Sequence, residues 1–423
     1  MKPPSLPDPQ APKEKLPSLA LGLAVLPYFV VRGWMSAAIV MLGVGALFAL
    51  HQRSYWRRIL DQQALMVLMG ALCAPLLAAA LVQAAHGQFV ARSFDPLVRL
   101  VLAALLLAHL YIHRVSWLPV ARVALPVAIL VGVAWIYSPW VVRYHEQWGN
   151  RVASQFMDPL MLAQHASLAA FLCLFLIRQQ AHRALTALQV AAVVAGIGVS
   201  IATGSRSGWG MIPVIALLWL ASLGWLKRPA HLAAGLALVA LLSLGLYAGS
   251  STVHHRLTEA EQEIRTFFDG SVRNTSVGVR LTMYGIAWEA FWAKPLLGWG
   301  FIQVPTPQTL PVIAPYWNDL IRTTLTDTGA HNEWLQSSIR MGVVGWLSRL
   351  ALYGVPFLVF LRAARSQLPE RKTAGYLGLV VLIAYLSAGM TTEVLHLVFT
   401  ASYFGFMVAT LGAIALPPPH RSE

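Results

Sequence analysis

Long apolar runs follow one another along almost the whole chain, and they limit the folds that it can adopt. A helix needs roughly 20 consecutive apolar residues to cross a hydrocarbon core about 30 Å thick. With 57% hydrophobic and only 11% charged residues, the composition is not that of a soluble globular protein. The sequence therefore predicts an all-α polytopic membrane protein with about twelve transmembrane helices. The expected spans are 17–31, 34–50, 63–85, 96–112, 117–137, 158–177, 184–203, 209–226, 231–248, 342–361, 374–390 and 394–416.

The first two spans are short, and 34–50 also fits a re-entrant segment, so most of the uncertainty in the count lies in 17–50. Lysine and arginine are concentrated in alternate connections, which is the pattern of cytoplasmic loops. We therefore expect both termini in the cytoplasm, an even number of spans, and residues 249–341 outside, which is the periplasmic face of the inner membrane in a bacterium. The basic residues assigned to the cytoplasmic side are Lys2, Lys13, Lys15, Arg53, Arg57, Arg58, Arg114, Arg178, Arg183, Lys227, Arg228, Arg362, Arg365, Arg371, Lys372 and Arg421.

These assignments divide the chain into five parts. The parts are a disordered, proline-rich cytoplasmic N-terminus (1–16), nine transmembrane helices (17–248), the outer segment (249–341), three further transmembrane helices (342–416) and a cytoplasmic tail (417–423).

The outer segment is the one long stretch that is not built to lie in lipid. It holds eight of the 17 acidic residues, and loops of such length are usually functional or disordered. Its pattern predicts helices at 256–268 and 280–293, an irregular proline-rich stretch at 301–328, and a third helix that starts near His331. A separate connection, 138–157, has the mixed character of a helix lying on the membrane surface.

The formal net charge of +14 admits two interpretations. Nucleic-acid binding is one, but in a chain this apolar the charge is better explained by topology and by attraction to anionic lipids or substrates. We expect membrane lipids as partners and no nucleic acid. Cys73 and Cys173 both lie in apolar runs, where small buried residues are more common than a disulfide or a metal pair.

Two arginines on the outer side stand against local preference. Arg206 lies in the turn Thr203–Trp209, where the alternatives are a snorkelling interfacial arginine and an anion site formed with glycine and serine backbone N–H groups. Arg280 is expected to open the helix 280–293, where a cation opposes the helix dipole. It is either an exposed helix-end charge or a functional group. Tyr284 lies one turn further on the same face and adds a hydroxyl group.

Two further polar pairs lie on this side. His331 and Asn332 stand at the expected helix start beside an irregular loop; a lone histidine is more often structural, but a pKa near 6.5 suits a general base. Glu393 and His396 lie at the turn between the last two spans and give a weaker signal.

Common metal and nucleotide motifs are absent from the sequence. It has no HExxH, no CxxC, no P-loop, no dinucleotide fingerprint and no Asp-x-Asp pair. We expect no metal and no cofactor, so arginine side chains would have to neutralise any pyrophosphate that binds.

Three short motifs occur in a fixed order around the outer segment: SRSGW, then R-x-x-x-Y-x-x-A-x-x-x-F followed by PLLGWG, then HNEWLQ. In this order, late in a chain of about twelve spans, they resemble the O-antigen ligase/O-antigen polymerase C-terminal superfamily. The resemblance implies a GT-C-like membrane fold with one large periplasmic helical loop between the ninth and tenth spans. It also implies a metal-independent, inverting glycosyltransferase that uses an undecaprenyl-pyrophosphate-linked donor.

Within this superfamily the chain length fits an O-antigen ligase, which moves O-polysaccharide onto lipid A–core. The resemblance assigns pyrophosphate binding to Arg206 and Arg280 and proton transfer to His331, with Tyr284 and Asn332 as further substrate-binding residues. The alternatives are an O-antigen polymerase, a protein O-oligosaccharyltransferase, a transporter of lipid-linked glycan and a pyrophosphate-lipid hydrolase. Basic residues that would contact the phosphates of lipid A–core are Arg143, Arg151, Arg265, Arg273 and Lys294.

Overall fold

The computed structural model describes residues 15–49, 53–177, 182–225, 228–270 and 274–418, and helices are the regular elements in these ranges. The predicted disordered N-terminus, most of the predicted tail and Arg273 therefore lie outside the described residues, apart from 15–16 and 417–418. The α-helices are α1 (Lys15–Val25), α2 (Trp34–Ala49), α3 (Arg53–Leu60), α4 (Gln63–Ala85), α5 (Ala91–Ile112), α6 (Leu118–Ile136), α7 (Pro139–Glu146), α8 (Pro159–Ile177), α9 (Arg183–Ala202), α10 (Met211–Ser222), α11 (Pro229–Gly249), α12 (Ser251–Phe268), α13 (Ser276–Ala293), α14 (Asp319–Asp327), α15 (Glu333–Ala364), α16 (Pro369–Gly389) and α17 (Val398–Ala415). Short 3-10 helices are η1 (Arg206–Gly208), η3 (Pro311–Tyr316) and η4 (Val394–His396).

Each predicted span coincides with a helix, which makes the protein an all-α polytopic membrane protein. Nine helices in the described ranges are long and apolar enough to cross a bilayer: α4, α5, α6, α8, α9, α11, α15, α16 and α17. The other three expected spans correspond to shorter helices, α1, α2 and α10, of 11, 16 and 12 residues. The count of twelve depends on these three and remains a prediction.

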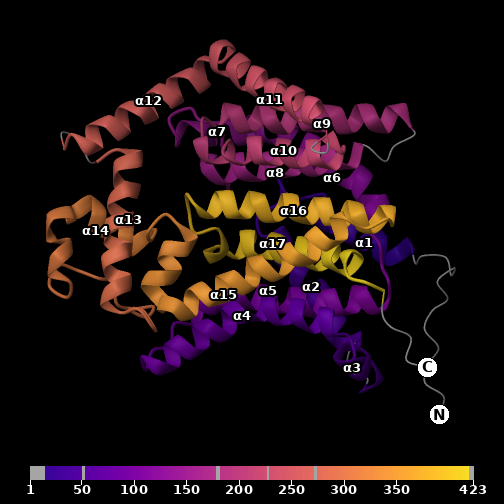
Figure 1. Cartoon of the computed structure of the whole chain (residues 1–423), viewed down its shortest axis with the longest axis horizontal. Coiled ribbons are helices and arrows are strands. Elements are labelled where there is room, and N and C mark those ends of the chain that lie inside the picture. Colours follow the sequence, from indigo (N-terminus) through magenta and orange to yellow (C-terminus); the bar gives the residue numbers. More distant parts are fainter. Residues whose placement is uncertain (1–14, 50–52, 178–181, 226–227, 271–273, 419–423) are drawn as a thin grey trace.

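Helices α16 and α17 lie in the middle of the bundle (Figure 1). In Figure 1, α8, α9 and α10 lie on one side of them and α4 and α5 on the other. Helix α17 packs along α5, and α16 packs along α15. Gly378 allows close approach, because a Cβ atom there would overlap the ring of Phe360.

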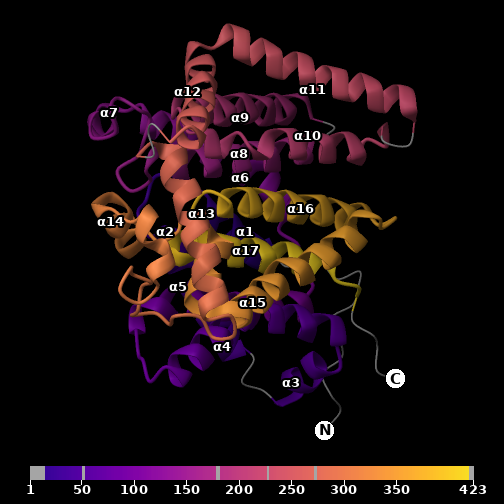
Figure 2. The ribbon, with the colours of Figure 1, turned by 60° about the vertical axis from the view of Figure 1, so that its left-hand side comes forward.

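The outer segment covers one end of this bundle. Helices α11 and α12 meet at an angle at Ser250, and α13 then runs across the bundle end, as Figure 2 shows. Helix α13 carries a small core of its own, in which Met283, Ile286 and Ile321 are buried.

Two local expectations differ from the structure. Residues 301–328 are not wholly irregular, because Asn318 caps α14 by accepting from the backbone N–H of Ile321 at 2.9 Å. Ile321 and Leu325 then bury the same face of α14. The surface helix expected over 138–157 is shorter than predicted, since α7 ends at Glu146.

Helix α15 joins the third predicted outer helix to the tenth predicted span. The two parts meet at Gly342, which has φ 57° and ψ −141°. The Pro295–Gly300 turn packs against this break. Val343 N donates to Pro295 O at 2.8 Å, and Trp299 N donates to Ile339 O at 2.8 Å.

We expect Gly342→Ala to destabilise the fold. A Cβ atom at 342 would overlap the carbonyl oxygen of Pro295, and the left-handed backbone favours glycine. Overpacking of this kind typically costs about 1–3 kcal/mol. The measurement is the melting temperature of the purified protein in detergent. Gly354→Ala in the same helix is the matched control: a Cβ there meets nothing within 4 Å, so its melting temperature should stay the same or rise.

Candidate functional site

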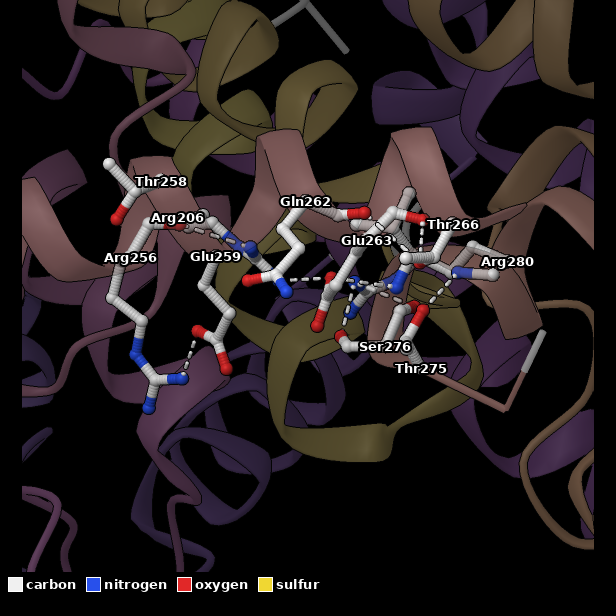
Figure 3. Close-up of polar contacts among 12 residues, drawn as sticks. Arg206, Arg256, Thr258, Glu259, Gln262, Glu263, Thr266, Thr275, Ser276 and Arg280 are labelled. Carbon is white, nitrogen blue, oxygen red and sulfur yellow. Dashed lines mark hydrogen bonds and ion pairs between the residues drawn. The ribbon is translucent and has the colours of Figure 1, made fainter. Parts of the chain in front are cut away.

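Arg206 reaches from the turn after α9 to the side of α12. Gly204, with φ +63°, turns the chain away from α9, and η1 begins at Arg206. The Arg206 guanidinium donates through Nη1 to the carbonyl oxygen of Arg256 at 3.1 Å and through Nη2 to Glu263 at 3.2 Å. Figure 3 shows Arg206 and Glu263 facing each other. In this structure Arg206 is therefore held by protein groups of α12.

Arg280 lies in the second turn of α13, not at its start as the sequence suggested. Thr275 caps the helix by accepting from Gly278 N at 3.0 Å, which places Ser276 in the first turn. Arg280 Nη1 donates to Ser276 Oγ at 3.0 Å. Its buried Nε has no hydrogen-bond partner among the described residues. Burial lowers the pKa of Arg280, and the nearby charge of Arg206 lowers it further.

His331 sits in a strained loop beside these arginines. Its φ of +50° is unusual for a residue with a side chain, and Gly329 before it is also left-handed at +72°. The ring Nε2 lies 3.3 Å from Thr328 Oγ1. Burial lowers the pKa of His331 from 6.5, and the charge of Arg280 lowers it further. The imidazole is therefore mostly neutral at pH 7 and able to accept a proton.

Asn332 and Tyr284 join this loop to α13 and to the bundle. Asn332 caps α15 by accepting from Trp334 N at 2.9 Å, so it lies just before the helix that the sequence predicted to start near His331. Its amide nitrogen lies 3.4 Å from both Tyr284 Oη and the carbonyl oxygen of Met390. Tyr284 donates its hydroxyl proton to the same carbonyl at 2.8 Å. The five predicted site residues thus lie together at one end of the bundle. Among them, the charge of Arg206 acts on Arg280, and the charge of Arg280 acts on His331.

Glu263, which the sequence did not single out, contacts Arg206 and the start of α13. Its carboxylate accepts from Arg206 Nη2 and from the backbone N–H of Val277, each at 3.2 Å (Figure 3). Val277 belongs to the first turn of α13. The carboxylate of Glu263 therefore lies between the guanidinium group of Arg206 and the N-terminus of α13. That combination suits a phosphate oxygen equally well.

Further arginines surround the turn at Gly204. The guanidinium groups of Arg151 and Arg256 both approach Gly204, and Arg151 Nε donates to Thr203 O at 2.8 Å. Arg256 pairs with Glu259 at 2.7 Å. Burial lowers the pKa of Arg151, and the charge of Arg256 adds to this. Arg151, Arg206, Arg256 and Arg280 thus face three acidic side chains, Asp158, Glu259 and Glu263, which leaves positive charge in excess.

The other basic residues suggested as contacts for phosphate-rich glycolipid have protein partners. Arg143 lies over the ring of Tyr144, Lys294 lies over Trp299, and Arg265 pairs with Glu261 at 2.5 Å on the exposed side of α12. Over the ranges that the structure describes, no three histidine, cysteine or acidic side chains form a group that could hold a metal ion.

Residues 191–350, which include all five predicted site residues, match the family model described as O-antigen ligase. Over that segment, the resemblance to the O-antigen ligase superfamily is confirmed. An uncharacterized protein of Haemophilus influenzae is 24% identical over 255 residues, and the alignment covers 59% of each chain. The chain thus spans about three fifths of the length of this curated relative, whose name gives no activity.

Proposed function

We propose that the protein is an O-antigen ligase. It would transfer O-polysaccharide from undecaprenyl pyrophosphate to lipid A–core in lipopolysaccharide biosynthesis. The observation that carries this proposal is the meeting of Arg206, Arg280 and His331 in the segment with family similarity. Guanidinium groups bind phosphate oxygens bidentately, and a neutral imidazole beside them can serve as a general base.

The reaction follows from these roles. His331 takes the proton from the acceptor hydroxyl, and the hydroxyl oxygen attacks the anomeric carbon of the donor sugar. The bond from that carbon to the phosphate oxygen breaks as the new glycosidic bond forms on the opposite face, so the configuration inverts. Arg206 and Arg280 stabilise the negative charge that develops on the departing undecaprenyl pyrophosphate. No metal has a role in this scheme.

The proposed reaction belongs on the periplasmic side of the inner membrane, with both termini in the cytoplasm. The excess of lysine and arginine in alternate connections supports this orientation. We accordingly propose 249–341 as the periplasmic catalytic loop, with the five-part division 1–16, 17–248, 249–341, 342–416 and 417–423 given above. Residues of the loop lie together at one end of the bundle, where a lipid carrier in the bilayer can present its head group (Figure 1).

A reconstituted transfer assay tests the function. Purified protein in liposomes receives an undecaprenyl-pyrophosphate-linked glycan and lipid A–core in the presence of EDTA. A glycan-bearing lipopolysaccharide band supports the ligase. A glycan that lengthens on its own carrier would make the protein a polymerase, and a glycan that appears on added protein would make it an oligosaccharyltransferase. If the carrier-linked glycan crosses the bilayer and no new product forms, the protein is a transporter and not a transferase.

Glu263→Gln should lower the KM for the donor several-fold. The carboxylate of Glu263 holds Arg206 and the N-terminus of α13, and a bound pyrophosphate must compete with it. Glutamine keeps the size and a hydrogen bond but removes the competing charge. The measurement is the donor KM at fixed acceptor concentration.

Glu261→Gln is the matched control for this substitution. Glu261 lies on the same helix, 60% exposed and paired with Arg265, so its removal should leave the donor KM unchanged. A rise in donor KM with Glu263→Gln would instead mean that the carboxylate orients Arg206 for the donor.

A further inference from the structure

The turn between α16 and α17, residues 390–397, contacts the neighbours of His331 on both sides. The carbonyl oxygen of Met390 accepts from Tyr284 Oη at 2.8 Å and lies 3.4 Å from the amide nitrogen of Asn332. The backbone N–H of Leu395 donates to Glu333 Oε2 at 3.1 Å. This turn lies outside residues 191–350, and nothing in the family similarity assigns it a role.

Glu393 is the charged side chain of this turn, and only 7% of it is exposed. Its Oε2 accepts from Arg340 Nη1 at 3.1 Å. Its Oε1 is buried without a hydrogen-bond partner within the described residues, and it faces Gly329. A Cβ atom added to Gly329 would overlap this oxygen. The carboxylate therefore fills the space against the loop that carries His331.

Contacts with neighbouring side chains hold the backbone of the loop Gly329–Asn332. Gly329 and His331 both have left-handed backbones, and such a conformation costs of the order of 1–3 kcal/mol for a residue with a side chain. The N–H of Ala330 donates to Gln336 Oε1 at 2.8 Å. The carboxylate of Glu393 lies beside this amide, against Gly329. A buried carboxylate oxygen left unpaired is itself costly, and a purely structural contact would be served better by an apolar side chain.

We propose that Glu393 is a positioning residue for His331. Its carboxylate packs against Gly329 and pairs with Arg340. These two contacts fix the loop Gly329–Asn332 so that the imidazole of His331 faces Arg280. Glu393 does not touch the substrate. This inference rests on the proposed function of His331 as the base, and it adds a second element, the α16–α17 turn, to the machinery.

The first test compares Glu393→Ala with Glu393→Gln in the transfer assay. A small displacement of a catalytic group can cost about 10²-fold in rate, so Glu393→Ala should lower kcat by about 10- to 100-fold. The KM values of donor and acceptor should stay the same. Burial raises the pKa of Glu393 to about 7, so the neutral form is already populated near neutrality and glutamine should restore most of kcat. Asp319→Asn, at a carboxylate that is 95% exposed on α14, is the control and should leave kcat unchanged.

A double-mutant cycle with Gly329 tests the contact itself. Gly329→Ala should lower kcat because its methyl group collides with the Glu393 carboxylate. In Gly329→Ala/Glu393→Ala the overlap with the carboxylate is gone, while the close contact with Gln336 Oε1 at 2.9 Å and the positive φ remain. The combined loss should therefore be smaller than the product of the two single losses. Independent, multiplicative losses would overturn the proposal. So would a raised KM, or a lowered melting temperature that accounts for the lost activity.

A third measurement needs no substrate and separates this proposal from the proposed function. Diethyl pyrocarbonate modifies neutral imidazole, and peptide mass spectrometry reports the rate at His331. Glu393→Ala should change this rate several-fold, with His254 on α12 as the internal reference, whereas Asp319→Asn should not. If the wild-type protein transfers no glycan but the His331 rate still responds to Glu393, the function is wrong and the positioning stands. An unchanged His331 rate overturns the positioning, whatever the assay gives.

Discussion

His331→Ala should reduce transfer to the limit of detection. General-base catalysis contributes typically about 10²–10⁴-fold, and the charge of Arg280 acts directly on His331. Because the substitution removes the base and leaves the arginines in place, kcat should fall while the KM for the donor stays close to that of the wild type. The measurement is the initial rate of lipopolysaccharide formation with both substrates varied.

The pH dependence of the wild type provides a second check on the same residue. The base acts in its neutral form, so kcat/KM should fall as the pH is lowered through the pKa of His331. Burial and Arg280 hold that pKa below 6.5, so the acid limb should lie below pH 6.5. The limb should be absent from the residual activity of His331→Ala. An acid limb that persists in this variant would show that another group accepts the proton. A variant that loses donor binding and keeps kcat would assign His331 to binding instead.

Arg280→Ala should lower kcat by about 10²–10³-fold, which is the typical loss when one preorganised donor to a developing oxyanion is removed. Its Nε is buried without a hydrogen-bond partner among the described residues, so this nitrogen is available to a ligand. Burial near Arg206 makes a bound dianion more favourable, because the anion relieves the repulsion between the two guanidinium groups. We therefore expect a raised donor KM as well.

Arg280→Lys should recover little of this loss, since an ammonium group cannot reproduce the planar, bidentate geometry. The measurement is kcat and donor KM for the three proteins, with Arg322→Ala as the control. Arg322 is 60% exposed and pairs only with a surface aspartate in the described structure. Its removal should therefore leave kcat and the donor KM unchanged. Full activity of Arg280→Lys would reduce the role of Arg280 to that of a point charge.

The helical bundle could be predicted from the sequence because each span is one run of consecutive apolar residues. Runs of about twenty apolar residues leave few alternatives to a membrane helix, and the helix predicted to start near His331 begins at Glu333. Helix α14 was missed for the opposite reason. Its cap, Asn318, follows a proline-rich stretch that has the composition of an irregular loop, and nine residues are too few for a clear periodic pattern.

The site could be predicted only in part. Arg206, Arg280 and His331 were found because each departs from a local preference or belongs to a motif. Glu263 could not be found in this way, since α12 carries three glutamates at alternate positions, 259, 261 and 263, and the sequence does not say which one faces a turn 57 residues earlier. Glu393 was noticed, but its contact with Gly329 depends on two distant turns that meet only in the folded chain.

Helix α11 has a further consequence for the site. Only 6% of its most apolar stretch is buried inside the protein, so nearly all of that stretch is open to contact with lipid. Its 21 residues correspond to about 31 Å of helix, close to the thickness of a hydrocarbon core. The tilt of such a helix follows the thickness of the surrounding bilayer. Because α12, which carries Glu263, follows α11 after the bend at Ser250, we expect hydrophobic mismatch to affect the pairing of Glu263 with Arg206. The rate of the proposed transfer should then depend on the lipid composition of the membrane.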